Sequence, residues 1–325
     1  MLDMRWFYEG KENFVSFSRL LNNMPISFYT SEFSEYLLDQ FWAKTRTKIL
    51  VQQFLPFIAL MILAVFYMHY ELEHEPDDRD DESRAGYYCR KGAGIFTILF
   101  IFWSLRTELF QFAYAERKMD YICSGWNWVD FFGLMFTLTI TFHTLLEMTL
   151  IPIESLRILA AVASLFLLMK VYDWLRLFEN TAFYVLLLQE TLNDLKWFLV
   201  LLGVAFLMFG LPMSMLSLNR SDEDSRLIQE RFEFWFIDLI YNQYLLALGE
   251  FETDSFMAGN ETRLVLLIFI CATFYTQIIV LNMLIAVMSD SFANFMENRL
   301  KNAILTKLRI LYDMAPVLSQ QTKRR

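Results

Sequence analysis

Charged residues are scarce in this chain of 325 residues, since Asp, Glu, Lys and Arg together make up only 20% of it. A soluble protein usually carries about 25% charged residues, and the mean hydropathy here is positive, at +0.34. Hydrophobic residues account for 56% of the chain and aromatic residues for 17%. The composition therefore excludes an ordinary soluble domain, and the net charge of −9 argues against a nucleic-acid partner.

Cysteine and histidine are also rare, with three of each. The cysteines are widely spaced and odd in number, so they form neither a disulfide framework nor a metal-binding pattern. Membrane enzymes gather His, Asp or Cys at membrane depth, and many transporters show internal repeats; we find neither feature and expect no enzyme. The residues concerned are Cys89, Cys123, Cys271, His69, His74 and His143.

Long apolar runs are the dominant feature of the sequence. A helix needs about 20 apolar residues to cross a bilayer, and six runs reach roughly that length. They are Ile49–Met68, Gly92–Tyr114, Trp128–Met148, Ile151–Tyr172, Leu195–Leu218 and Leu264–Ser289. A seventh run, Phe232–Leu248, is too short to span. The sequence therefore predicts an all-α membrane protein with six transmembrane helices.

The flanking charges predict how the chain is oriented, because cytosolic flanks favour Lys and Arg. Lys44–Lys48 holds three bases and no acid, and Met296–Arg325 holds seven bases against two acids. By contrast, Glu71–Glu82 has eight acids and one arginine, as expected of a solvated outer loop that at most collects cations weakly. We therefore expect a multi-pass protein with both termini in the cytosol, in the plasma membrane rather than an internal one.

Two glycosylation sequons bracket the seventh run, with Asn219 before it and Asn260 after it. If the run dips into the bilayer and returns, both asparagines lie outside, whereas a full crossing would place them on opposite sides. A single sequon is weak evidence. Together with the charge distribution, the pair favours a re-entrant pore helix between spans five and six.

The sequence LGEF follows this short run and combines a glycine with a carboxylate. Gly249 permits a turn that a Cβ would hinder, and irregular backbone at membrane depth is tolerated only inside protein or beside water. One chain cannot enclose a pore, but four can, and Glu250 would then form a ring of carboxylates that attracts cations. The alternative is a short packed helix followed by an external acidic loop. The predicted selectivity filter is Leu248, Gly249, Glu250 and Phe251, with Glu252 and Asp254 at the outer mouth.

Three segments resemble the membrane domain of the transient receptor potential (TRP) cation-channel superfamily, over about Phe41 to Leu311. They are Trp174–Phe198, similar to the linker between spans four and five; Leu248–Phe251, similar to the filter; and Ile279–Phe292, similar to the inner pore helix. The resemblance implies a homotetramer of voltage-gated-like architecture, in which spans five and six line the pore. We expect permeating cations and membrane lipids as partners, with calcium as a permeant and regulatory ion as a hypothesis; a lipid ligand is left open.

The inner-pore-helix motif also implies the position of a gate. Asn282 matches the family's polar residue and Ile285 its intracellular constriction, and both share a helical face with Ser289. An apolar ring can block ions by dewetting; packing against lipid or a neighbour is the alternative for Ile285.

The family's tryptophan after span six is missing, but apolar spacing still predicts an amphipathic helix there. The expected parts are 1–43 (cytosolic segment), 44–173 (bundle of spans one to four), 174–194 (linker helix), 195–294 (pore domain) and 295–325 (amphipathic helix and tail).

Two pairs of polar residues at i, i+3 lie near the cytosolic ends of spans two and three. Glu108 and Gln111 end span two, and Asn127 and Asp130 begin span three, so the four side chains should meet at one depth. Two carboxylates and two amide oxygens suit part of a calcium shell of six to eight oxygens, and melastatin-like TRP channels carry similar pairs. The alternative is ion pairing with Arg106, Lys170 or Arg176.

The predicted function is a tetrameric, nonselective, calcium-permeable cation channel, with activation by cytosolic calcium as a further hypothesis. A single-repeat voltage-gated cation channel and a multipass transporter are the alternatives. Voltage sensors repeat arginine every third residue along span four. Here Arg157 is followed by no base until Lys170 and Arg176, which disfavours a voltage sensor.

Overall fold

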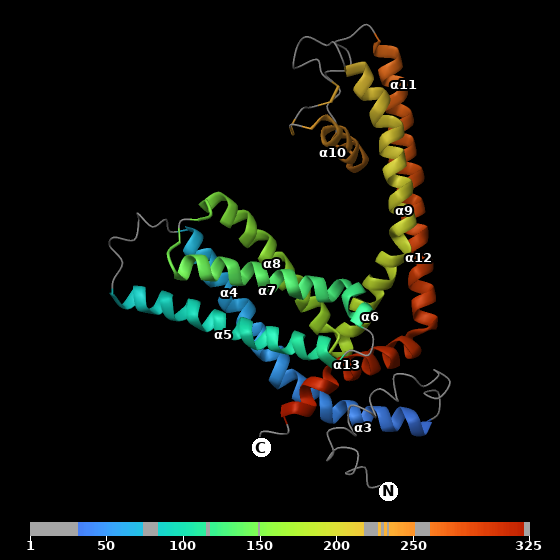
Figure 1. Ribbon diagram of the computed structural model, residues 1–325. Helices are drawn as coiled ribbons and strands as arrows, with labels where there is room; N and C mark the ends of the chain where they lie inside the picture. The colour runs from blue at the N-terminus through green and yellow to red at the C-terminus, as the bar shows by residue number, and fades with distance from the viewer. Residues whose placement is uncertain are drawn as a thin grey trace. The chain divides into compact units, whose positions relative to one another are not determined.

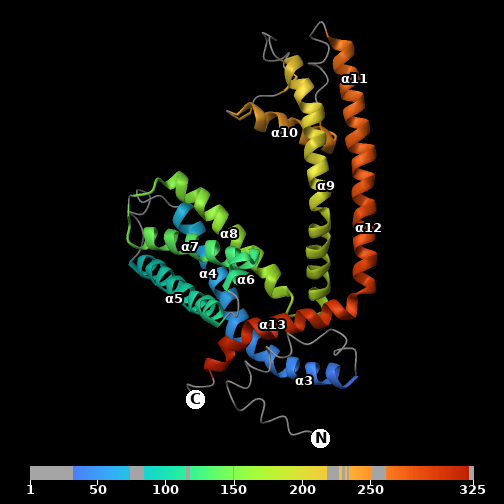
Figure 2. The ribbon, with the colours of Figure 1, turned by 45° about the vertical axis from the view of Figure 1, so that its right-hand side comes forward.

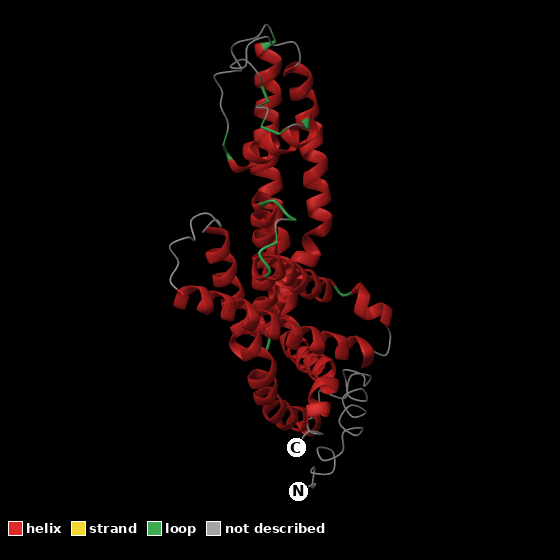
Figure 3. Cartoon of the chain, turned by 60° about the vertical axis from the view of Figure 1, so that its left-hand side comes forward, coloured by secondary structure: helices red, strands yellow, loops and turns green. Residues whose placement is uncertain are grey.

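The computed structural model describes residues 32–73, 84–114, 118–148, 150–217, 227–228, 231–232, 234–250 and 261–321. Every regular element within these residues is a helix, and none is a strand (Figure 3). Six helices are long and apolar enough to cross a membrane, which confirms the predicted six spans. They are Leu38–Glu73, Arg84–Ala113, Gly125–Leu145, Ile153–Leu175, Lys196–Ser217 and Thr262–Glu297.

The chain folds into two compact units, Met1–Val185 with Arg299–Arg325 and Leu186–Asn298. The boundary between them falls inside a single helix, α9 (Glu179–Ser217). A separate linker helix over 174–194 is therefore not observed, since α9 continues through the predicted boundary into span five. The reason is local: residues 179–202 contain neither glycine nor proline, so nothing in that stretch ends the helix.

The first unit contains a bundle of four helices: α4 (Leu55–Glu73), α5 (Arg84–Tyr114), α7 (Gly125–Leu145) and α8 (Ile153–Leu175). They lie side by side in both views (Figures 1 and 2). Close packing holds helices together in a membrane, and Leu60, Ile101, Ile140 and Ala163 are fully buried in this core. A Cβ on Gly133 of α7 would lie 3.2 Å from the Cβ of Phe166, so this glycine lets α7 and α8 approach closely.

A π-helical segment, η2 (Leu50–Phe54), joins α3 (Glu32–Ile49) to α4 without a break. Its cause is visible in the sequence: Pro56 has no N–H to donate to the carbonyl four residues before it, so the regular ladder is interrupted here. The segment turns Gln53 inward, where its Oε1 accepts a 3.0 Å hydrogen bond from Thr107 of α5. A polar group is thus placed in the bundle core with a partner.

The predicted amphipathic helix after span six is α13 (Arg299–Gln321), which packs against α3 and α5. Ile304, Leu308 and Leu311 are buried on this side, while Leu300 remains exposed. Lys307 of α13 binds Asp39 of α3 at 2.7 Å. The helix therefore belongs to the same compact unit as the four-helix bundle.

Glu71, the first residue of the acidic run, is buried in the last turn of α4 rather than solvated as the sequence suggested. Its carboxylate accepts a 3.1 Å hydrogen bond from Arg90 of α5, which is 7% exposed. Residues 74–82 of the run lie outside the described residues. The Glu71–Arg90 ion pair joins α4 to α5.

Replacing Arg90 by alanine should lower the melting temperature of the purified protein by about 5–10 °C, because breaking a buried pair leaves an uncompensated charge and costs about 3–5 kcal/mol. Differential scanning fluorimetry in detergent measures this. Arg84→Ala is the matched control, since Arg84 is exposed on the same helix. Equal melting temperatures for the two variants would show that the Glu71–Arg90 pair does not stabilise the bundle.

The second unit contains the C-terminal part of α9, the short helix α10 (Trp235–Leu248), and one long helix made of α11 (Thr262–Thr273), η6 (Phe274–Val280) and α12 (Leu281–Glu297). Figures 1 and 2 show α9 running beside this long helix. The 14 residues of α10 extend only about 21 Å, less than the roughly 30 Å of a hydrocarbon core. The seventh apolar run is therefore a helix too short to span.

Candidate functional site

The predicted filter begins where α10 ends, at Gly249. This residue has φ +88°, a left-handed conformation that favours glycine. The Gly249 N–H donates to the carbonyl of Leu246 at 3.1 Å, and the Glu250 N–H donates to that of Leu245 at 2.9 Å. These two bonds form a Schellman motif, so the sequence LGE ends the helix and fixes the backbone of Glu250 directly beyond it.

Two sources of negative charge meet at this turn. The carbonyls at a helix C-terminus carry about half a negative elementary charge, and Glu250 adds a carboxylate next to them. Both favour a cation over an anion. Leu248 and Glu250 are exposed in the single chain, so the turn is not packed away inside the unit.

Close contacts hold α10 within this unit. At its start, buried Asp238 accepts hydrogen bonds from the backbone N–H groups of Arg231 and Phe232, at 2.8 and 3.0 Å. Along its length, α9 approaches so closely that a Cβ on Gly210 would lie 2.5 Å from Leu239. The short helix is thus a fixed support for the turn that follows it.

Several predicted residues lie outside the part of the chain that the structure describes. They are Phe251 of the filter, Glu252 and Asp254 of the outer mouth, and the glycosylation sites Asn219 and Asn260. Their roles stay predictions. The described part of the filter is Leu248, Gly249 and Glu250.

The three predicted gate residues all lie on α12, at spacings of three and four residues that place them on one face. Ile285 is 64% exposed in the single chain, and Asn282 and Ser289 are exposed as well. The Asn282 side chain donates to the carbonyl of Ile278 at 2.6 Å, within the same helix. This face is uncovered within one chain, so the exposure of Ile285 agrees both with a residue that lines a pore and with one that contacts lipid.

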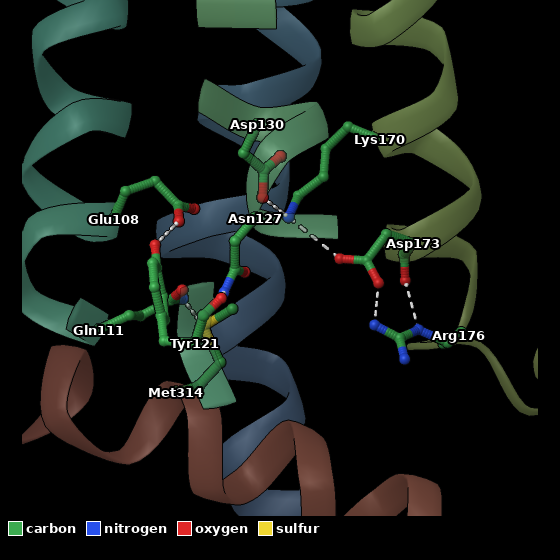
Figure 4. Close-up of polar contacts among 9 residues, drawn as sticks. All are labelled: Glu108, Gln111, Tyr121, Asn127, Asp130, Lys170, Asp173, Arg176 and Met314. Atoms are coloured by element: carbon green, nitrogen blue, oxygen red, sulfur yellow. Dashed lines mark hydrogen bonds and ion pairs between the residues drawn. The ribbon is translucent and has the colours of Figure 1, made fainter. Parts of the chain in front are cut away.

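The four residues of the predicted calcium site come from two neighbouring helices of the bundle, as Figure 4 shows. Glu108 and Gln111 lie on α5, and Asn127 and Asp130 lie on α7. Asp130 is buried, and its carboxylate is bound by the ammonium group of Lys170 from α8. The ion-pair alternative is therefore present in the structure, with Lys170 as the partner.

The other three residues also have partners. Glu108 accepts a 2.7 Å hydrogen bond from the Tyr121 hydroxyl of α6 (Lys118–Cys123), and Asn127 donates to the Tyr121 carbonyl at 2.8 Å. Gln111 Nε2 lies 3.9 Å from the sulfur of Met314 on α13. Burial raises the pKa of the Tyr121 phenol, and the charge of Glu108 raises it further. Tyr121 therefore stays protonated and donates to Glu108.

Two of the four predicted ligands share a cavity. Glu108, Asp130 and Lys170 line a space of about 30 Å³ between the helices, whereas Gln111 and Asn127 do not line it. That volume is enough for water beside polar groups. Within the described residues, no three His, Cys, Asp or Glu side chains are arranged to hold a metal ion. Calcium would have to use two carboxylates and amide or water oxygens, and to displace Lys170.

The charges on α8 continue beyond this cavity. Lys170 also binds Asp173 at 3.0 Å, and Asp173 is bound in turn by Arg176 (Figure 4). Burial lowers the pKa of Arg176 to about 10, so it keeps its charge at neutral pH. Arg106, the third cation considered from the sequence, lies over the rings of Trp103 and Phe110. The cations of this region are therefore largely held by local partners.

Sequence reasoning missed Tyr121 and Gln53, which contact or line the region around Glu108. The only signal for Gln53 is a polar residue at the start of an apolar span. Tyr121 lies between two spans, in a segment with no pattern that singles it out. His143, by contrast, is buried and accepts a hydrogen bond from the backbone of Ile151 at 3.2 Å, a structural contact.

Residues 48–300 match a protein family that is described as ion transport protein. The match begins within the first span, covers the other five completely and includes the turn at Gly249 and Glu250. Among curated proteins, none matches the chain.

Proposed function

We propose that this chain is a TRP-type, nonselective, calcium-permeable channel. The chain belongs to the ion transport protein family. This is a family of voltage-gated-like cation channels and not of enzymes. Four copies would surround one pathway, with Glu250 of each copy in the filter. The observation that carries this proposal is the short helix α10, whose C-terminal carbonyls and Glu250 bring negative charge to one turn. Permeating cations would bind the carbonyl oxygens and the Glu250 carboxylate at this turn.

The arrangement of charge along the chain supports the proposed orientation. Basic residues flank the first and last spans, and the sequons lie on either side of α10. We therefore assign both termini to the cytosol and Asn219 and Asn260 to the outer side of a plasma membrane. Ile285 on α12 would form the apolar constriction, because it lies at the helical face shared with Asn282 and Ser289.

Activation by cytosolic calcium is the second part of the proposal. Glu108 and Asp130 line one cavity, and Lys170 already fills the place of a cation beside Asp130. Calcium would bind there by replacing the ammonium group, with Gln111 and Asn127 supplying further oxygens after side-chain rotation. Asp173, which already lies 3.0 Å from the Lys170 ammonium group, would remain available as its partner.

A voltage-gated channel without calcium activation is the competing function. Voltage sensing requires several arginines that can move along span four. On α8, the guanidinium of Arg157 donates to the carbonyl of Leu72, and Lys170 is bound by two carboxylates. This small number of locally held charges favours a ligand over voltage as the stimulus.

Purified chain in liposomes tests the channel function. We expect sodium and calcium to enter and chloride to be excluded, in a complex with four times the 38.7 kDa mass of one chain. Ion-sensitive dyes report the fluxes, and mass photometry reports the assembly. Chloride flux equal to sodium flux, or a complex of a different size, would contradict the proposal.

A further inference from the structure

We propose that Gln277 is a positioning residue of the filter, which holds the end of α10 in place and so sets the position of Glu250. The inference rests on the proposed function, because it treats Gly249 and Glu250 as part of the filter. Gln277 lies on the π-helical segment η6, on the long helix beside α10. Its side chain therefore links the inner helix directly to the filter turn.

The contact is a single hydrogen bond at a critical carbonyl. Gln277 Nε2 donates to the Leu246 carbonyl at 3.1 Å, across 31 residues of sequence. The same carbonyl accepts the 3.1 Å bond from the Gly249 N–H, so it joins the Schellman turn to the neighbouring helix. Both lone pairs of this oxygen are then used. Loss of the Gln277 amide would remove this bond between the turn and the neighbouring helix.

The Gln277 amide also lies against the glycine of the turn. A Cβ on Gly249 would lie 3.5 Å from Gln277 Nε2, which is ordinary van der Waals contact. The side chain thus packs beside the residue that reverses the chain direction. Glu250 follows immediately, so a displacement of the turn moves its carboxylate by a similar amount.

The π-helical segment explains why Gln277 faces α10. In η6 the Leu281 N–H bonds to the carbonyl of Thr276, five residues back. The hydroxyls of Thr273 and Thr276 bond to carbonyls four residues before them, at 2.9 and 2.7 Å, and so compete with the regular backbone ladder. The sequence TFYTQ thereby favours the local change of helix type.

A return of this segment to regular α-helix would change two surfaces together. One residue fewer per turn rotates the two flanking parts of a helix by about 100° relative to each other. Gln277 would leave the Leu246 carbonyl, while Asn282 and Ile285 on the continuous α12 would face a new direction. The Gln277 bond therefore favours the π-helical form of η6, in which the filter turn is held in place and Asn282 and Ile285 keep their present direction.

Two substitutions separate the hydrogen bond from the shape of the side chain. Gln277→Met keeps the length and removes the donor, whereas Gln277→Glu carries a side chain that accepts when ionised and donates when protonated. The measurement is the calcium-to-sodium permeability ratio of reconstituted channels, from reversal potentials at pH 8 and pH 6 on both sides. Each ratio is divided by that of the wild type at the same pH. Tyr275→Phe on the same segment is the control, because the Tyr275 ring contact with Phe209 is retained.

We expect Gln277→Met to lower the ratio by about fivefold at both pH values, the scale of one lost hydrogen bond. Gln277→Glu should show the loss at pH 8 and at pH 6, because a carboxyl with the ordinary pKa of about 4.3 is ionised at both and has no proton to donate. An added negative charge alone would favour divalent cations, so a fall in the ratio at pH 8 reports the lost donor. Tyr275→Phe should match the wild type.

The proposal is overturned if wild-type channels are cation-selective and both Gln277 variants keep the wild-type ratio at each pH. That outcome would leave the channel function intact. If Gln277→Met does not assemble, Gln277→Glu decides alone: a ratio below that of the wild type supports the proposal, and the wild-type ratio overturns it. If wild-type chain conducts no cations, the proposed function fails, and the filter role of Gln277 fails with it.

Discussion

Glu250→Gln should lower the calcium-to-sodium permeability ratio by about tenfold or more, and relieve block of the sodium current by external calcium. Four carboxylates would become four neutral amides of nearly the same shape. A divalent ion loses twice the charge–charge attraction that a monovalent ion loses, so calcium should be affected more strongly. A tenfold change in relative rates corresponds to about 1.4 kcal/mol. Reversal potentials in mixed sodium and calcium solutions measure the ratio.

The matched control for Glu250→Gln is Glu261→Gln, which removes a carboxylate just before α11. It should change the ratio far less, because Glu261 is beyond the turn that ends α10. If both variants behave alike, the effect is one of general surface charge. If neither changes permeation or block, Glu250 does not line the pathway, and the predicted filter is wrong.

Asp130→Ala should abolish activation by cytosolic calcium, or raise the half-activating concentration by about a hundredfold, near 3 kcal/mol of binding free energy. The reason is that Asp130 is one of only two carboxylates in the cavity between α5, α7 and α8. Inside-out patches with stepped calcium measure the response. Glu154→Gln, an exposed carboxylate at the start of α8, is the control and should respond as wild type.

Lys170→Gln distinguishes a calcium site from an ion pair that only stabilises the bundle. If Lys170 competes with calcium for Asp130, this variant should respond at about tenfold lower calcium, near 1.4 kcal/mol. In a purely structural pair, Asp130→Ala and Lys170→Gln would both lower the melting temperature and leave the calcium response unchanged. An unchanged response in Asp130→Ala would reject the calcium site and keep the channel.

The six spans could be predicted because each is an apolar run long enough for a bilayer, and the short helix α10 because its run is clearly shorter. The π-helical segments Leu50–Phe54 and Phe274–Val280 could not, since each is a local change of register within an otherwise helical pattern. The fusion of the linker with span five in α9 was also missed. Residues 179–202 contain neither glycine nor proline, so the sequence offers no strong helix breaker between the linker and span five.

Residues of the candidate sites could be predicted where spacing along one helix was enough. Of the four residues that the two i, i+3 pairs were expected to bring together, Glu108 and Asp130 line one cavity, and Lys170 was one of three cations considered for pairing. Contacts between different helices could not be predicted from spacing along one helix. The bond from Gln277 to Leu246 depends on the turn at Gly249 and on the π-helical register, neither of which a helical period reveals.

The most direct test of the account is the reversal potential of single channels formed by the purified wild-type chain, recorded between unequal sodium chloride solutions. The account predicts a reversal potential close to that of sodium, shifted towards that of calcium when calcium is added to one side. The carboxylate and carbonyls at the end of α10 are the cause. A reversal potential near that of chloride, or no preference between sodium and chloride, would contradict the account.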